Sequence, residues 1–183
     1  MKKILFIIIL SLMCAGELFS QDIKDVVETK SDKFSNRSGS LIQKEFNEVG
    51  KVIGNEITVL KIKDLNSNET ISSVRFKNTS YSSTFGEEEY LNSIDKEELD
   101  GLIISVKKLI DEVIKTEPSV YSEVVYRSVS GFSLGAFYRN EAKKKGWVPF
   151  LKVDKYKSKS FSTLNENNLI EILALLEKAK EMM

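Results

Sequence analysis

The sequence predicts an α+β fold of antiparallel sheets in which several strands are followed by one helix, twice over. Three observations support this. β-branched and aromatic runs alternate with polar turns, two segments have the apolar spacing of helices, and the connections are too short for the crossovers that parallel strands need. With 183 residues, 42% of them hydrophobic, and only two prolines, the chain can form a stable globular core.

Residues 1–20 have the pattern of a secretory signal peptide. Lys2 and Lys3 precede an apolar run over residues 4–13, and small and polar residues follow as far as Ser20. The run is too short to cross a bilayer as a permanent anchor. We therefore expect a secreted or periplasmic protein, with cleavage after Ser20 or, as an alternative, after Gly16.

The composition excludes several chemistries. The chain has no histidine and one cysteine, Cys14, so it cannot form an intramolecular disulfide, a His-ligated zinc site or an imidazole-based triad. A cysteine at the end of the apolar run also suggests a lipoprotein, but bulky Met13 stands where that pattern needs a small residue. Lys+Arg and Asp+Glu both number 27, so no net charge attracts nucleic acid or membranes. We expect no cofactor, no metal and no catalytic residue.

The remaining chain is predicted to be a polar lead-in followed by one domain. Residues 21–39 form a loosely ordered segment or a short helix, and residues 40–183 form a single α+β domain with pseudo-halves of about 40–117 and 118–183. In the first half, residues 40–52 fit a strand or a helix, with the strand favoured, and strands are expected over residues 57–62 and 71–78, with a polar turn at 65–69.

A helix is predicted after these strands. Asp95 and Glu98 have the spacing of a capping box, and Ile94 and Leu99 that of a hydrophobic staple. An apolar stripe then continues to Val113, and Pro118 is expected to end the helix; the stripe comprises Leu99, Leu102, Ile103, Val106, Leu109, Ile110 and Val113.

The second half repeats this order. Strands are expected over residues 120–128, 132–139, 147–153 and 158–163, and a helix from Asn165. With an offset of 70 residues, the entrance to the first helix, residues 91–95, aligns with residues 161–165. The sequence therefore predicts a tandem ββββα arrangement.

This order of elements resembles the PUR and whirly-type single-strand binders, although no binding residue carries over. The signal segment and the Gly-Ser-Leu-Ile opening at residues 39–42 also resemble small uncharacterised secreted proteins of Bacteroidota-type bacteria. Neither resemblance implies an activity.

Three catalytic or metal-binding patterns have simpler interpretations. Ser105 and Lys108 match the S-x-x-K of serine β-lactam-recognising enzymes, but the companion motifs are missing and a surface serine explains the match. Residues 87–89 are three glutamates, which a carboxylate-based hydrolase could use and which a solvated acidic loop explains better. Residues 64–69 place oxygen side chains at alternate positions, but they lack the glycine and closing glutamate of a calcium loop, so a turn is favoured.

Charge is unevenly distributed along the chain. Residues 87–100 contain seven acids and one lysine, whereas residues 139–159 contain eight basic residues and two acids, with aromatic residues among the lysines. Lysines interleaved with aromatics suit an anionic polymer, and strand arginines can clamp a carboxylate or phosphate. The candidate binding residues are Arg75, Arg127, Arg139, Lys143, Lys144, Lys145, Trp147, Phe150 and Tyr156.

Two alternatives remain for these charges. The lysines can form a solvated face of a hairpin whose aromatics face the core, or the acidic and basic segments can face each other within one molecule or between two.

The sequence therefore predicts a non-catalytic binding or interaction module. Its partner would be an anionic polymer or glycan, or an envelope protein; nucleic acid is not expected because of export. The alternatives are a carboxylate-based hydrolase and a self-associating structural subunit of the cell envelope.

Overall fold

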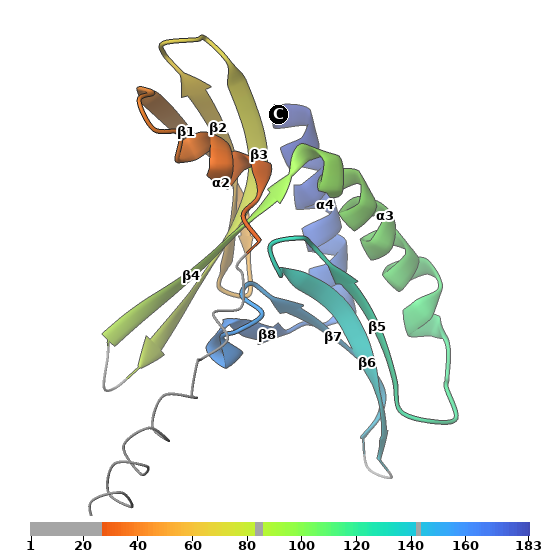
Figure 1. Cartoon of the computed structure of the whole chain (residues 1–183). Coiled ribbons are helices and arrows are strands. Elements are labelled where there is room, and N and C mark those ends of the chain that lie inside the picture. Colours follow the sequence, from red (N-terminus) through yellow and green to blue (C-terminus); the bar gives the residue numbers. More distant parts are fainter. Residues whose placement is uncertain (1–26, 83–85, 142–143) are drawn as a thin grey trace, which may run out of the picture.

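The computed structural model describes residues 27–82, 86–141 and 144–183; the predicted signal segment, with Cys14, and Lys143 lie outside these ranges. Two four-stranded antiparallel sheets are present, and each is followed by a helix (Figure 1). The predicted α+β class and its tandem ββββα order are therefore confirmed.

The first sheet has its strands in chain order, and each pairs with the next in antiparallel register. Its elements are β1 (Ile42–Val52), β2 (Asn55–Asp64), β3 (Thr70–Ser82) and β4 (Gly86–Asp95), followed by α3 (Lys96–Asp111). The interpretation of Glu87, Glu88 and Glu89 as a loop is wrong: they belong to β4, because their backbone pairs with Thr79–Tyr81 of β3. Strand pairing here overrides the low strand propensity of glutamate.

The second sheet is also in chain order. Its elements are β5 (Ser122–Arg127), β6 (Ser133–Glu141), β7 (Lys144–Lys152) and β8 (Phe161–Thr163), followed by α4 (Glu166–Met182), with short 3₁₀ helices η2 (Val113–Lys115) and η3 (Ser158–Ser160). The last strand is shorter than predicted because η3 takes up its first half. Pro118 does not end the first helix, since α3 has already ended at Asp111 and η2 follows.

The two long helices begin differently. Asn165 caps α4: its side chain accepts from the Asn168 backbone amide, and the Asn168 side chain accepts from the Asn165 amide, both at 3.0 Å. The capping box predicted for α3 is wrong, because the Asp95 side chain makes no cap hydrogen bond. Glu98 is also used elsewhere, since its Oε1 accepts from the backbone amide of Val129 at 2.8 Å.

One hydrophobic core joins the two halves. Helices α3 and α4 lie side by side, run in opposite directions, and bury their apolar stripes against the inner faces of both sheets (Figure 1). Phe76 of β3 meets Phe132 of the second half with ring centroids 4.4 Å apart, and both are fully buried. Exposed ion pairs, Lys107–Glu177 and Lys180–Asp100, join the helices at their outer edge.

A short helix, α2 (Lys30–Ser35), covers the outer face of the first sheet, on the side away from α3 and α4. It lies within the predicted polar lead-in. Its Phe34 forms a second small core with Leu60 and Ile62 of β2. The Asp95 carboxylate holds the start of this helix, accepting from the backbone amides of Lys30 at 2.7 Å and Ser31 at 3.1 Å.

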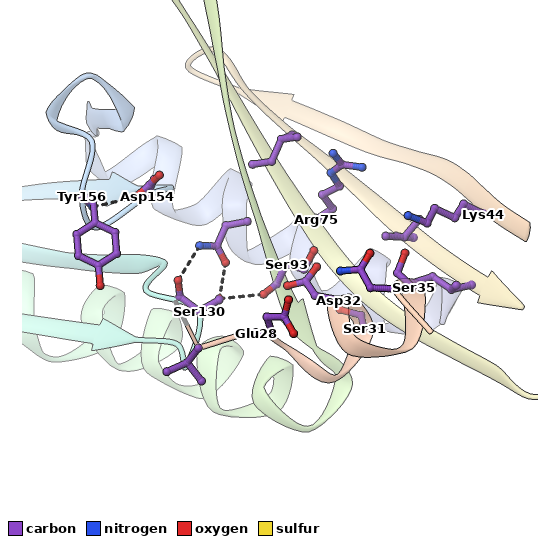
Figure 2. Close-up of a pocket in the computed structure, with 16 residues that line it drawn as sticks. Glu28, Ser31, Asp32, Ser35, Lys44, Arg75, Ser93, Ser130, Asp154 and Tyr156 are labelled. Atoms are coloured by element: carbon purple, nitrogen blue, oxygen red, sulfur yellow. Dashed lines mark hydrogen bonds between the residues drawn. The ribbon is translucent and has the colours of Figure 1, made fainter. Parts of the chain in front are cut away.

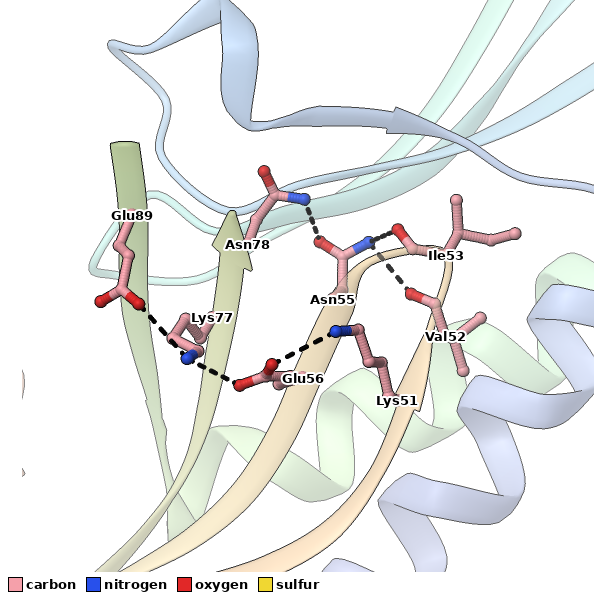
Figure 3. A network of polar contacts seen from close by, with 8 residues as sticks. All are labelled: Lys51, Val52, Ile53, Asn55, Glu56, Lys77, Asn78 and Glu89. Carbon is pink, nitrogen blue, oxygen red and sulfur yellow. Dashed lines mark hydrogen bonds and ion pairs between the residues drawn. The ribbon is translucent and has the colours of Figure 1, made fainter. Parts of the chain in front are cut away.

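Polar contacts organise the turn between β1 and β2 (Figure 3). Ile53 has φ 45° and Gly54 φ 72°, a conformation that is strained for a β-branched residue. The Asn55 side-chain amide stabilises the turn by donating to the Ile53 carbonyl at 3.0 Å. It also donates to Ser162 Oγ at 3.1 Å, while its oxygen accepts from Asn78 at 2.9 Å. Asn55 therefore links the turn, the first sheet and β8.

Candidate functional site

The predicted binding residues do not form one site. Arg139 and Phe150 line a hollow on the outer face of the second sheet. Arg75 and Tyr156 line a separate cavity beside α2. Arg127, Lys144, Lys145 and Trp147 line neither hollow, although Arg127 and Lys144 lie on the same face of the second sheet as Arg139 and Phe150.

The hollow on the second sheet has three phenylalanine rings in a row. Phe137, Phe150 and Phe161 come from β6, β7 and β8 and lie on the face away from the helices. The ring centroids of Phe150 and Phe161 are 5.2 Å apart in a stacked arrangement, and those of Phe137 and Phe150 are 6.1 Å apart. Phe161 is 41% exposed. The hollow has a volume of about 530 Å³, enough for a small ligand or a segment of a polymer.

Cationic side chains lie on the same sheet face as these rings. The Arg139 guanidinium lies over the Phe137 ring, 5.4 Å from its centroid. By strand register, Arg127, Lys144 and Lys152 lie on the same face. Arg127, Arg139 and Lys144 make no ion pair within the described ranges.

Two carboxylates share this face. Glu123 and Glu141 lie beside the rings, and Glu123 accepts a hydrogen bond from the Tyr121 hydroxyl. Against the four cations, the two acids leave a local charge of +2, so the face can hold an anion next to an aromatic surface.

Part of the basic segment is neutralised within the molecule. Lys145 pairs with Glu117 at 2.7 Å, and this hydrogen bond lowers the pKa of Glu117 and raises that of Lys145. Lys159 pairs with Glu88 of β4 at 3.0 Å. The acidic strand and the basic loop therefore meet within one molecule, as one of the sequence interpretations proposed.

Glu88 joins this contact to the first sheet. The Tyr90 hydroxyl donates to Glu88 Oε2 at 2.6 Å, and this bond, together with Lys159, lowers the pKa of Glu88. The same hydrogen bond, with burial adding to it, raises the pKa of Tyr90 to about 12.

Trp147 has a structural position. It lies on the inner face of β7, edge-on to Tyr138 with ring centroids 5.4 Å apart, and packs against the main core. Its Nε1 donates to the Thr116 carbonyl at 3.0 Å. These contacts hold the segment between α3 and β5 in place, and they use the hydrogen-bond donor of the indole ring.

A second cavity lies beside α2 and is lined mainly by polar side chains (Figure 2). It has a volume of about 440 Å³ and lies among α2, the outer face of β1–β4 and two turns of the second half. Arg75 enters it from β3 and Lys44 from β1, while Asp154 and Tyr156 lie across from them.

The Ser105–Lys108 motif is not a paired site. Ser105 Oγ donates to the Gly101 carbonyl one turn earlier at 2.7 Å, and Lys108 pairs with Glu112. Asp64 accepts from the Asn66 amide at 2.9 Å and from Ser40 Oγ, and these bonds lower its pKa. Ser105 and Asp64 therefore form hydrogen bonds with the backbone of their own segments. This agrees with the interpretation of Ser105 as a surface serine and of residues 64–69 as a turn.

Sequence reasoning missed Phe137, Phe161 and Lys44. Strand alternation contains a signal for Phe137, because it lies between the buried Ala136 and Tyr138 and therefore points to the opposite face. Phe161 follows the buried Ser160 in the same way. Lys44 had no such signal, since its role depends on a helix that covers part of its strand.

No family model matches this chain, and no curated protein matches it. Among the described residues, no helix has the length and apolar content needed to cross a membrane.

Proposed function

We propose that this protein is an exported binding protein that holds an acidic polysaccharide on the outer face of β5–β8. The observation that carries the proposal is the row formed by Phe137, Phe150 and Phe161 on a sheet face that α3 and α4 leave uncovered.

An aromatic row beside free cations suits a charged sugar chain. The flat rings offer apolar faces to the C–H faces of sugar rings, and neighbouring rings allow successive residues of a polymer to stack. Arg139 lies at the end of the row and can form a bidentate hydrogen bond with a carboxylate or sulfate.

Export supports a glycan over a nucleic acid. The N-terminal pattern of Lys2, Lys3 and an apolar run directs the chain out of the cytoplasm, where polysaccharides are the abundant polyanions. From the resemblance in element order to PUR and whirly-type binders, the proposal takes only the idea that a sheet face can bind a ligand. N-terminal sequencing of the exported protein should give Gln21 as its first residue.

The binding proposal is tested with alginate, a polyuronate, and neutral dextran of matched length. Isothermal titration calorimetry at low salt should show alginate binding more tightly than dextran, because only alginate uses the cations. The double variant Phe150→Ala/Phe161→Ala should bind alginate at least about tenfold more weakly. Arg139→Gln should weaken alginate binding and leave dextran unchanged.

Two matched variants serve as controls. Tyr81→Ala removes an aromatic ring that is 81% exposed on β3, and Arg75→Gln removes an arginine from the other cavity. Both should bind alginate like the unmodified protein. Alginate binding that is equal in the double variant, or absent from the unmodified protein, would refute the proposal.

A further inference from the structure

The cavity beside α2 contains charges of both signs that do not pair with each other. Arg75 and Lys44 line it together with Glu28, Asp32 and Asp154. Ten ion pairs join charged side chains elsewhere in the described ranges, and none of these five residues takes part in one. The cavity therefore contains positive and negative side chains that form no ion pair with one another.

The positive charges come from the sheet. Arg75 is half-buried on β3, and its guanidinium lies 5.4 Å from the centroid of the Phe46 ring, which supports the side chain without neutralising it. Lys44 enters the cavity from β1 (Figure 2), where it pairs in register with Ile62, and Leu60 and Ile62 are apolar residues of the lining. A carboxylate at this end would meet a fork of guanidinium donors and a second cation.

The three carboxylates differ in the hydrogen bonds that they already accept from the protein. Asp32 completes the capping box of α2 by accepting from the Thr29 amide, so part of its charge is compensated there. Asp154 uses Oδ1 to accept from the Tyr156 amide at 2.8 Å, which orients the carboxylate and leaves Oδ2 for another donor. Glu28 is exposed at the rim.

Neutral polar groups lie between these charges. The Ser130 hydroxyl donates to the Ser93 carbonyl at 3.1 Å, and Asn92 donates to the Val153 carbonyl at 2.9 Å. These bonds join the turn before β6 and the end of β7 to strand β4. This part of the cavity lining is thereby held by contacts between the two halves of the chain.

We propose that this cavity binds a small zwitterion, a short peptide with free ends. Its carboxylate meets Arg75 and Lys44, and its ammonium meets Asp154 and Glu28. A volume of about 440 Å³ is within the range of small-molecule sites. The proposal is independent of polysaccharide binding, because it uses no residue of the β5–β8 face.

The experiment compares trialanine with its N-acetylated and C-amidated forms by calorimetry on the full exported chain. Trialanine with free ends should bind, and either modification should weaken binding at least about tenfold, because each removes one charge pair. In Arg75→Gln, amidation should no longer matter, while acetylation still should. In Asp154→Asn, acetylation should no longer weaken binding, whereas amidation still should.

Control variants separate this result from misfolding and from the glycan face. Arg127→Gln and Glu87→Gln change one charge of each sign outside the cavity and should bind trialanine like the unmodified protein. Thermal unfolding should show that Arg75→Gln and Asp154→Asn remain folded, and both should still bind alginate if the glycan face is functional. No saturable binding of trialanine, or equal binding of all three forms, would overturn the proposal.

Discussion

The outer faces of the two sheets contain similar apolar residues but have different surroundings. On the first sheet, α2 packs its Phe34 against Leu60 and Ile62, and the three residues are buried. On the second sheet, Phe137 and Phe150 are half-buried, Phe161 is exposed, and the two long helices pack against the opposite face.

This difference explains how two sheets with the same order of elements come to have one covered and one uncovered outer face. An apolar sheet face becomes core only where another element covers it. The first half has a helix before its first strand, and Asp95 holds that helix in place. At the equivalent position of the second half, Asn165 caps its own helix instead.

The comparison predicts that Phe34 and Phe161 contribute unequally to stability. Phe34→Ala should lower the free energy of unfolding by about 3 kcal/mol, since a buried ring leaves a cavity. Phe161→Ala should lower it by less than about 1 kcal/mol, because the ring is already partly in water. Urea denaturation measures both. Equal losses of unfolding free energy would show that the outer face of the second sheet is as well covered as that of the first.

Asp95 should matter next most. Asp95→Ala removes the acceptor of two backbone amides at the start of α2, and we expect a loss of about 2 kcal/mol. Hydrogen exchange should accelerate at Lys30 and Ser31 and stay slow in α4. Unchanged exchange at these two amides would mean that Asp95 does not hold the covering helix.

Asn165 should show the contrasting effect in the other half. Asn165→Ala should cost about 1 kcal/mol through loss of the α4 cap. The loss should appear as exchange of the first-turn amides of α4, with α2 unaffected. Glu166→Ala, which alters the same turn without touching the cap bonds, is the control and should cost only about 0.3 kcal/mol. Similar values for the two variants would contradict a capping role.

The smallest effect concerns the contact between the acidic strand and the basic loop. The pKa of Glu88 is held below its ordinary value of 4.5 by Tyr90 and Lys159. A lowered pKa means that the contact stabilises the fold above the ordinary value and that this contribution is lost as pH falls through the folded value. Lys159→Met should move the Glu88 titration towards its ordinary midpoint in carboxyl NMR. Lys155→Met is the control, and identical midpoints in the two variants would exclude a role for Lys159.

Much of the fold could be predicted because the signals are local. Alternation predicted the strands β1, β2, β3, β5, β6 and β7, whereas most of β4 was interpreted as an acidic loop; the apolar stripes identified the buried faces of α3 and α4. The prediction of a capping box at Asp95 was wrong for a physical reason. The carboxylate can accept hydrogen bonds from the first amides of α3 or from those of α2, and the sequence pattern does not show which amides lie closer.

The candidate sites were less predictable. Clustering along the chain suggested one basic and aromatic site over residues 139–159. Lys145 and Lys159 are instead paired with Glu117 and Glu88. Strand alternation places Trp147 and Phe150 on opposite faces of β7.

By itself, the sequence determined the absence of histidine, the order of strands and helices, and which side of each helix is buried, because composition and periodicity are properties of the chain alone. Only the tertiary structure decided which sheet face is covered, which charges are neutralised, and that Arg75 and Tyr156 line the same cavity. Those outcomes depend on contacts between residues far apart in the chain, and spacing along a sequence contains no distance in space.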